Sequence, residues 1–265
     1  MNIFSEIHCG LPREGPGCNE ATKRAFSGIS NIPKAASVLD LGCGPGLQTI
    51  ELSQLLKVSN GSITAVDHNE TYLKELALKV SEQTIDNIKC EKADMCNLHY
   101  ADNSFDIIWA EGAIYIIGFK KGLKEWKRIL KPNGIIAVTE LSWIADVIPK
   151  EISEFWSIEY SEMQSVEGNI NTANVCGYHV ESHFTLPESA WFDDYYAPLE
   201  IRINELKVKY EDNEEAQKVL NNELKEIVMY KQYSAYYGYE FYVLRSKRNE
   251  KNLLQIYSYS LHKSC

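Results

Sequence analysis

The nine-residue segment from Val38 to Gly46, VLDLGCGPG, constrains the fold more than any other part of this chain. Its first four residues form an apolar run typical of a buried strand, and three glycines follow at every second position. Because glycine has no Cβ, the backbone at Gly42 and Gly44 is free to turn sharply and to approach a ligand closely. A helix is expected to begin at about Leu47, and the partial positive charge of its N-terminus faces the same turn. The segment therefore predicts a strand, a ligand-binding turn and a helix in succession.

Short strand-like runs alternate with helical segments from Ser37 to Glu140. The strands are expected at 38–41, 62–67, 88–92, 105–110 and 135–140, and the helices at 47–57, 71–83 and 119–130, where Lys131–Gly134 stops the last helix. Such alternation predicts right-handed βαβ units and a parallel sheet. Ligands of these sheets bind beyond the carboxyl ends of the strands, so the residues just after each strand are the candidate site.

The pattern changes after Glu140. A helix is expected over 151–168, a strand over 178–186, a long charged helical region over 199–232 with a break near Asp212-Asn213, and a final strand over 238–245 with Tyr239, Phe241 and Val243 on one face. We therefore predict an α/β fold with a Rossmann-like, doubly wound, seven-stranded, mainly parallel sheet that ends in an antiparallel hairpin. One domain is expected over 1–248, with a cofactor-binding core at 37–140, an N-terminal lid at 1–36, a helical cover inserted at about 187–237, and a C-terminal tail at 249–265.

Charge and composition exclude several classes of protein. The net charge of −10 argues against a nucleic-acid partner, because phosphate neutralisation needs a basic face. No apolar run of about 18 residues is present, which argues against a membrane-spanning helix, and no secretory signal is visible, so a cytoplasmic location is expected. The seven cysteines form no C-x-x-C pair, so no metal site is predicted and the thiols are expected to be free.

Acidic residues follow the strands where a cofactor would bind. The spacing G-x-G-x-G differs from the G-x-G-x-x-G of dinucleotide enzymes, and Asp40 precedes the turn. A carboxylate there repels a phosphate but suits the amino and sulfonium groups of S-adenosylmethionine. Asp67 ends the second strand and is placed to accept hydrogen bonds from ribose hydroxyls. NAD enzymes use an acid in the same way, so Asp67 alone does not distinguish S-adenosylmethionine from NAD. Asp94 follows the third strand and is placed to accept from an adenine amino group, with Met95 as an apolar contact.

Together these segments resemble the class I S-adenosylmethionine-dependent methyltransferases, especially the ubiquinone and menaquinone biosynthesis group (methyltransferase type 11). The resemblance covers Ser37 to Glu140 and includes FDII at 105–108 and LKPNG at 130–134. It implies S-adenosyl-L-methionine as cofactor, S-adenosyl-L-homocysteine as product and a small-molecule acceptor. It also implies that the methionine part lies on Asp40, Gly42 and Gly44, the ribose on Asp67, and the adenine on Asp94, with further contacts from His68 and Met95.

The segment LPREGPG at 11–17 resembles the lead-in of a subset of bacterial small-molecule methyltransferases. Arg13 is then expected to reach the cofactor carboxylate or an acidic acceptor, while the glycines let the segment fold over the site. The alternative is a surface turn rich in proline and glycine. We favour the lid, because methyl transfer needs a cover that excludes water.

The acceptor side is less constrained by the sequence. Glu111, just past the fourth strand, is a candidate base, or alternatively a hydrogen-bond acceptor on the cofactor side or a carboxylate at a helix start. Tyr115, one helical turn beyond, is the second catalytic candidate. An acceptor pocket, or an aromatic cage for a cationic amine, is expected to draw on aromatic residues of the C-terminal half. The candidates are Trp143, Trp191, Tyr195 and Tyr196; core packing explains each one alone better, but one or two of the group are expected to line the pocket.

Two other functions remain open. The first is a nicotinamide-dependent oxidoreductase, against which the missing G-x-G-x-x-G and Asp40 argue. The second is a non-catalytic S-adenosylmethionine-binding sensor. The segment Ala110–Ala113 lacks the Asn/Asp-Pro-Pro-Tyr motif of the adenine- and glutamine-modifying branch, which further disfavours nucleic-acid and protein-amide substrates. A monomer or a homodimer is expected, and the sequence does not determine whether O, N, S or C is methylated.

Overall fold

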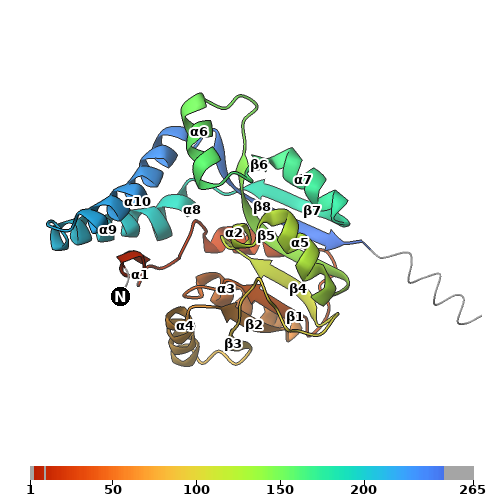
Figure 1. Cartoon of the computed structure of the whole chain (residues 1–265). Coiled ribbons are helices and arrows are strands. Elements are labelled where there is room, and N and C mark those ends of the chain that lie inside the picture. Colours follow the sequence, from red (N-terminus) through yellow and green to blue (C-terminus); the bar gives the residue numbers. More distant parts are fainter. Residues whose placement is uncertain (1–2, 9, 248–265) are drawn as a thin grey trace, which may run out of the picture.

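The computed structural model describes residues 3–8 and 10–247, so the predicted tail at 249–265 lies outside the described residues. One mixed sheet forms the centre of the molecule, in the order β3-β2-β1-β4-β5-β8-β7, with the short β6 paired to β5 (Figure 1). The strands are β1 (Ser37–Leu41), β2 (Ser62–Asp67), β3 (Ile88–Lys92), β4 (Phe105–Ala110), β5 (Leu130–Trp143), β6 (Gln164–Ser165), β7 (Tyr178–Thr185) and β8 (Tyr237–Ser246). Strands β1 to β5 pair in parallel, and β8 is antiparallel to both β5 and β7.

Helices cover both faces of the sheet. They are α1 (Ile3–His8), α2 (Asn19–Ser27), α3 (Leu47–Leu56), α4 (Glu70–Glu82), α5 (Phe119–Glu125), α6 (Lys150–Glu159), α7 (Val166–Val175), α8 (Ser189–Trp191), α9 (Ala197–Lys209) and α10 (Glu214–Tyr233). Successive residues of a strand point to opposite faces, so Val38 packs in the core on the α2–α3 side, whereas Leu39 packs in the core on the α5–α7 side. The predicted α/β, doubly wound fold is confirmed.

The predicted strands and the first two predicted helices of the region 37–140 are confirmed with small shifts of their ends, but the last helix and strand differ. Helix α5 ends at Glu125 and continues as a 3₁₀-helix, Trp126–Ile129. Strand β5 then begins at Leu130, although a helix-stopping turn was expected at 131–134. The sheet absorbs that turn as a register shift opposite Phe105 and Ile107, with Asn133 at a φ of 62°.

The single helix expected over 151–168 is wrong. The chain instead forms α6, a turn, the two-residue strand β6 and α7. Strand β6 pairs with Ser142 and Trp143 at the end of β5, so the sheet has one short strand more than the seven predicted. The side chain of Ser165 caps α7 by accepting a hydrogen bond from the amide of Gly168, which starts a new helix where continuity was expected.

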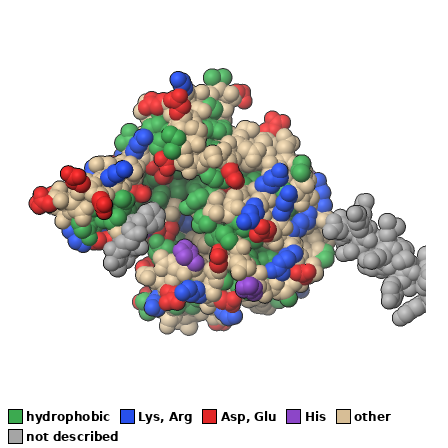
Figure 2. Space-filling view, in the orientation of Figure 1, with side chains coloured by type: hydrophobic (Ala, Val, Ile, Leu, Met, Phe, Trp, Pro, Cys, Tyr) green, Lys and Arg blue, Asp and Glu red, His purple; other side chains and the backbone are tan. Residues whose placement is uncertain are grey.

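The helical region between β7 and β8 divides at the predicted place. Helix α9 ends at Lys209, and the side chain of Asn213 caps α10 by accepting from the amide of Ala216. The two helices lie together and project from the molecule beside α1 (Figure 1). Figure 2 shows the surface hollowed between these helices and the sheet. Within the described ranges, no helix is long and apolar enough to cross a membrane.

Candidate cofactor and acceptor site

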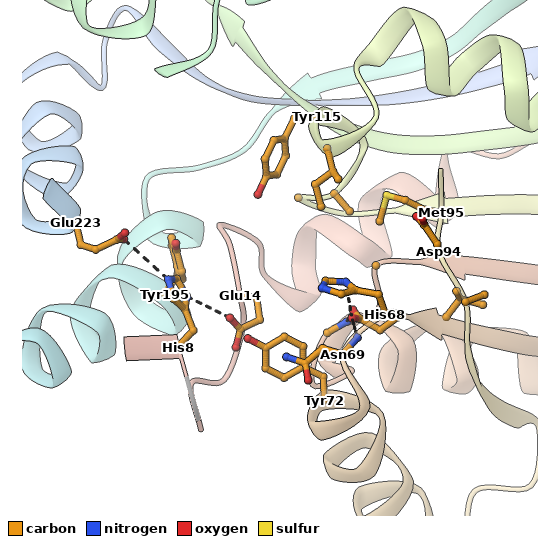
Figure 3. Close-up of a pocket in the computed structure, with 18 of the residues that line it drawn as sticks. His8, Glu14, His68, Asn69, Tyr72, Asp94, Met95, Tyr115, Tyr195 and Glu223 are labelled. Carbon is orange, nitrogen blue, oxygen red and sulfur yellow. Dashed lines mark hydrogen bonds and ion pairs between the residues drawn. The ribbon is translucent and has the colours of Figure 1, made fainter. Parts of the chain in front are cut away.

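A cavity of about 480 Å³ lies beyond the carboxyl ends of β1, β2, β3 and β4, where ligands of parallel sheets bind (Figure 3). Its size is within the range of small-molecule sites, roughly 300–1,000 Å³. One end is formed by the turns after these strands and the other by α1, the segment after it, and α10. The lining residues are His8, Glu14, Gly42, Gly44, Val66, Asp67, His68, Asn69, Tyr72, Ala93, Asp94, Met95, Gly112, Ala113, Tyr115, Ile116, Tyr195, Glu223 and Glu226.

The glycine turn has the conformation that its sequence requires. Gly42, Gly44 and Gly46 have φ of 69°, 52° and 88°, in the left-handed region that side chains disfavour. A Cβ at Gly42 would lie 2.6 Å from the Cβ of Ala113, so the turn and the segment after β4 approach each other closely. Helix α3 begins at the next residue after Gly46, and its N-terminus therefore points toward the turn.

Asp67 is held rigidly at the cavity wall. Its Oδ2 accepts from the amide of Gly44 at 3.0 Å and its Oδ1 accepts from the amide of Asn69 at 2.8 Å. The residue is 7% exposed, yet it lines the cavity. A carboxylate has about four acceptor positions, so two remain for hydroxyl donors such as a ribose diol. His68 is exposed, and its Nδ1 lies 3.5 Å from Oδ1 of Asp67.

The turn after β3 forms the next part of the wall. Asp94 and Met95 line the cavity together with the apolar side chains of Val66, Ala113 and Ile116. The indole of Trp126 donates to the carbonyl of Met95 at 3.0 Å and so fixes that backbone. An apolar slot with a carboxylate at its edge matches an adenine ring with an amino group.

Asp40 has a different environment from the one expected. It is fully buried, does not line the cavity, and accepts a hydrogen bond from the hydroxyl of Thr49 at 2.6 Å. Burial raises its pKa to about 7, and the carboxylates of Glu111 and Asp67 add to this effect. Asp40 thus joins β1 to α3 beneath the glycine turn, and the carry-over of a methionine-binding role to it stays a prediction.

Arg13 and Glu111 contact each other beside the main cavity. Nη1 of Arg13 lies 3.5 Å from Oε2 of Glu111, and both side chains are 4% exposed. Oε1 of Glu111 also accepts from the hydroxyl of Thr22 at 2.7 Å and from the indole of Trp109 at 2.9 Å. Both residues line a smaller pocket of about 50 Å³ that includes Gly42–Pro45. The polar contacts of Glu111 tie the N-terminal segment to β4, and its suggested role as a base stays a prediction.

The other end of the cavity combines acidic and aromatic side chains. Glu14, Glu223 and Glu226 line it with Tyr72, Tyr115 and Tyr195, and His8 lies between Glu14 and Glu223 (Figure 3). Among the predicted residues, only Tyr115 and Tyr195 belong to this end. Sequence reasoning missed His8, Glu14, Tyr72, Glu223 and Glu226. The i, i+3 spacing of the two glutamates on α10 places them on one face of the helix, but nothing local distinguishes that face from a solvated one.

The other predicted acceptor aromatics lie outside the cavity lining. Trp191 is 2% exposed and stacks on Tyr230, with ring centroids 4.0 Å apart. Tyr196 is 1% exposed and donates to Oε1 of Glu226 at 2.8 Å. Trp143 packs against Tyr237 with ring centroids 6.3 Å apart. Burial in the cover core explains the positions of Trp191 and Tyr196, whereas Trp143 is half-buried at the end of β5.

Known methyltransferases are similar to this chain in sequence and in fold. Residues 38–134 match the family model described as a methyltransferase domain. This match and the fold confirm the resemblance of the cofactor-binding core to the class I S-adenosylmethionine-dependent methyltransferases that the sequence indicated.

The relatives fall within the same class. The chain is 34% identical over 113 residues to a demethylmenaquinone methyltransferase of Staphylococcus epidermidis, covering 42% of this chain and 46% of the relative. It is 33% identical over 112 residues to the enzyme of the same name from Staphylococcus aureus, covering 42% and 45%. The chain thus matches about half the length of these curated relatives.

Solved structures share the whole fold. A methyltransferase from Geobacter sulfurreducens in complex with S-adenosyl-L-homocysteine has a TM-score of 0.76 at 20% identity, covering 93% of this chain and 98% of the other. The cyclase SpnF has a TM-score of 0.70 at 16% identity, covering 93% and 92%. Because a cyclase also has this fold, the similarity defines the architecture and does not define the reaction.

Proposed function

We propose that this protein transfers the methyl group of S-adenosylmethionine to a small-molecule acceptor. The observation that carries the proposal is the Asp67 carboxylate, which two backbone amides hold at the cavity wall beside a glycine turn with left-handed φ. The arrangement suits a ribose diol next to a ligand that passes close to the backbone. The proposal also rests on the match of residues 38–134 to a methyltransferase domain.

The residues present fit this cofactor in charge as well as in shape. Asp67 would hold the ribose, Asp94 and Met95 the adenine, and the backbone at Gly42 and Gly44 the methionine part. The cavity carries no lysine or arginine among its described lining residues, which disfavours the pyrophosphate of a dinucleotide. A carboxylate-rich wall instead suits a sulfonium ion.

The cofactor supplies an activated methyl group, so the protein mainly positions the acceptor and excludes water. The N-terminal segment serves the second role. Arg13 is anchored on Glu111 and on Oδ1 of Asn19, at 2.9 Å, which places Glu14 against the cavity. Helix α1 and the helical cover complete the enclosure. The net charge of −10 supports a small acceptor rather than a nucleic acid; a monomeric or homodimeric state and a cytoplasmic location stay predictions.

Titration calorimetry with S-adenosylmethionine, S-adenosylhomocysteine and NAD tests the proposal. We expect the first two to bind and NAD not to bind. Asp67→Ala should weaken binding at least tenfold, because hydrogen bonds to a charged group contribute about 1.5–3 kcal/mol. Asp86→Ala, a change of an exposed aspartate, is the matched control. Binding of NAD alone, or equal affinities in both variants, would overturn the proposal.

Methyl release separates an enzyme from a sensor. The protein is incubated with methyl-labelled S-adenosylmethionine and pools of small amines, thiols, phenols and carboxylates. Labelled product from at least one pool supports the enzyme. Binding of the cofactor without turnover in every pool favours the non-catalytic sensor instead.

A further inference from the structure

The charge of the cavity is strongly unbalanced. Five carboxylates line it, from Glu14, Asp67, Asp94, Glu223 and Glu226, whereas the basic residues among its described lining are the two histidines His8 and His68. Asp67 and Asp94 lie at the cofactor end. The three glutamates lie at the other end, where the acceptor would bind. A group of carboxylates that line one cavity with so little positive charge around it favours a cationic ligand.

The glutamates of α10 have few protein partners. Oε1 of Glu226 accepts from the hydroxyl of Tyr196 at 2.8 Å, and Oε2 of Glu223 lies 3.9 Å from Nε2 of His8. Neither forms an ion pair with a lysine or arginine in the described chain. Burial raises the pKa of Glu223, and raises that of Glu226 to about 7, so a nearby cation would stabilise both ionised carboxylates.

A second observation comes from Tyr195. This residue is 7% exposed and lines the same end of the cavity, yet its hydroxyl makes no hydrogen bond within the described residues. Because Tyr195 lines the cavity and its hydroxyl has no partner in the described chain, this hydroxyl is available to hydrogen-bond a bound ligand. Tyr115 lines the cavity nearby (Figure 3). The faces of such rings attract cations within about 6 Å of the ring centroid.

We infer that the end of the cavity formed by Glu223, Glu226, Tyr115 and Tyr195 binds the acceptor as a cation, and that this acceptor is a small amine methylated on nitrogen. The inference rests on the proposed function, and it names the acceptor class that the sequence left open. The three carboxylates exclude anionic acceptors by repulsion.

The reaction balances with groups that are present. The acceptor ammonium gives one proton to the Glu226 carboxylate and becomes a neutral amine. Its nitrogen lone pair then forms a bond to the methyl carbon as the sulfur–carbon bond breaks. Sulfur keeps that electron pair, which gives S-adenosylhomocysteine and a methylated ammonium. A carboxyl group that titrates near neutral pH suits this proton transfer.

The test separates recognition of the cation from methyl transfer. The full-length protein is saturated with S-adenosylhomocysteine and titrated calorimetrically with choline, and then with the uncharged isostere in which a tert-butyl group replaces the trimethylammonium. We expect choline to bind at least tenfold more tightly. Glu223→Gln and Glu226→Gln should each weaken choline at least fivefold, whereas Glu215→Gln, the same change at an exposed position of α10, should not.

Turnover with ethanolamine or dimethylamine as acceptor completes the test. We expect labelled N-methyl product, and in Glu226→Gln a fall in kcat larger than any rise in KM. If the unmodified protein does not bind S-adenosylhomocysteine, the proposed function itself is contradicted. Two results would overturn only the cationic acceptor, provided that S-adenosylhomocysteine binds. One is equal affinity for choline and its isostere, and the other is an unchanged affinity for choline in both glutamine variants.

Discussion

The amide of Gly44 donates a 3.0 Å hydrogen bond to Oδ2 of Asp67, which joins the glycine turn after β1 to the end of β2. The amides of Gly42 and Cys43 donate to the carbonyl of Val66 at 2.8 and 3.0 Å, so the two strand ends are connected at several points. The carboxylate that would bind the ribose is therefore also a structural part of the turn that would bind the methionine. A change at Asp67 should affect both stability and binding.

We expect Asp67→Asn to lower the free energy of unfolding and the affinity for S-adenosylhomocysteine together. The amide has one acceptor oxygen, so either Gly44 or Asn69 loses its partner at a buried position, at a cost of about 1–3 kcal/mol. Urea denaturation and calorimetry measure the two effects. Asp86→Asn is the control, and a variant with full stability but weakened binding would disprove the shared role.

Gly46→Ala should destabilise the protein by roughly 2–4 kcal/mol. The residue has a φ of 88°, and a Cβ there would overlap the side chain of Leu76 on α4. Gly15→Ala is the matched control, because no atom lies within 4 Å of its added Cβ. Urea denaturation of both variants measures the difference. Similar midpoints for Gly46→Ala and Gly15→Ala would contradict this conformation of the turn.

Arg13→Met should cost roughly 3 kcal/mol, because it leaves the buried carboxylate of Glu111 without its cation. Burial already raises the pKa of Glu111, and removing the arginine raises it further. Adding Glu111→Gln to this variant should restore at least about 1 kcal/mol, since the glutamine carries no charge. Denaturation of the two single variants and the double variant forms the cycle. Simple additivity would show that the pair is not coupled.

Glu140→Gln should reduce the loss of stability at alkaline pH. Glu140 is 1% exposed, accepts from the hydroxyl of Tyr160 at 2.7 Å, and has a pKa raised by burial from 4.5 to about 8. Between these two values the folded protein keeps a proton that the unfolded chain has released. The free energy of unfolding therefore falls as pH rises through this interval and levels off above it.

The measurement compares Glu140→Gln with the unmodified protein at pH 5 and pH 8.5. We expect the variant to gain on the order of 2 kcal/mol relative to the unmodified protein between the two pH values. Its absolute stability at pH 5 is not the readout, because the amide alters the hydrogen bond from Tyr160. Glu154→Gln, on the exposed face of α6, should leave the pH dependence unchanged. Parallel pH curves for Glu140→Gln and the unmodified protein would contradict the prediction.

The part of the fold around the glycine turn was predictable because its signals are local. A buried strand, the glycines at 42, 44 and 46, and an acid at the end of the next strand lie within about thirty residues, and each is required by backbone geometry or hydrogen bonding. Residues 151–168 were mispredicted for the converse reason. Pairing of Gln164 and Ser165 with β5 is a long-range interaction that helical periodicity does not report.

By itself, the sequence determined the parallel core, the glycine turn and the positions of Asp67, Asp94 and Met95, since each depends on neighbours in the chain. Only the tertiary structure decided the end of the cavity where we propose that the acceptor binds. Glu14 and Glu226 come from segments more than two hundred residues apart, and their chemistry depends on burial against one cavity. Tertiary packing also placed Trp191 in the cover core and Tyr195 at the cavity. Both are aromatic residues of one short segment, and only the direction in which each ring points distinguishes core from site.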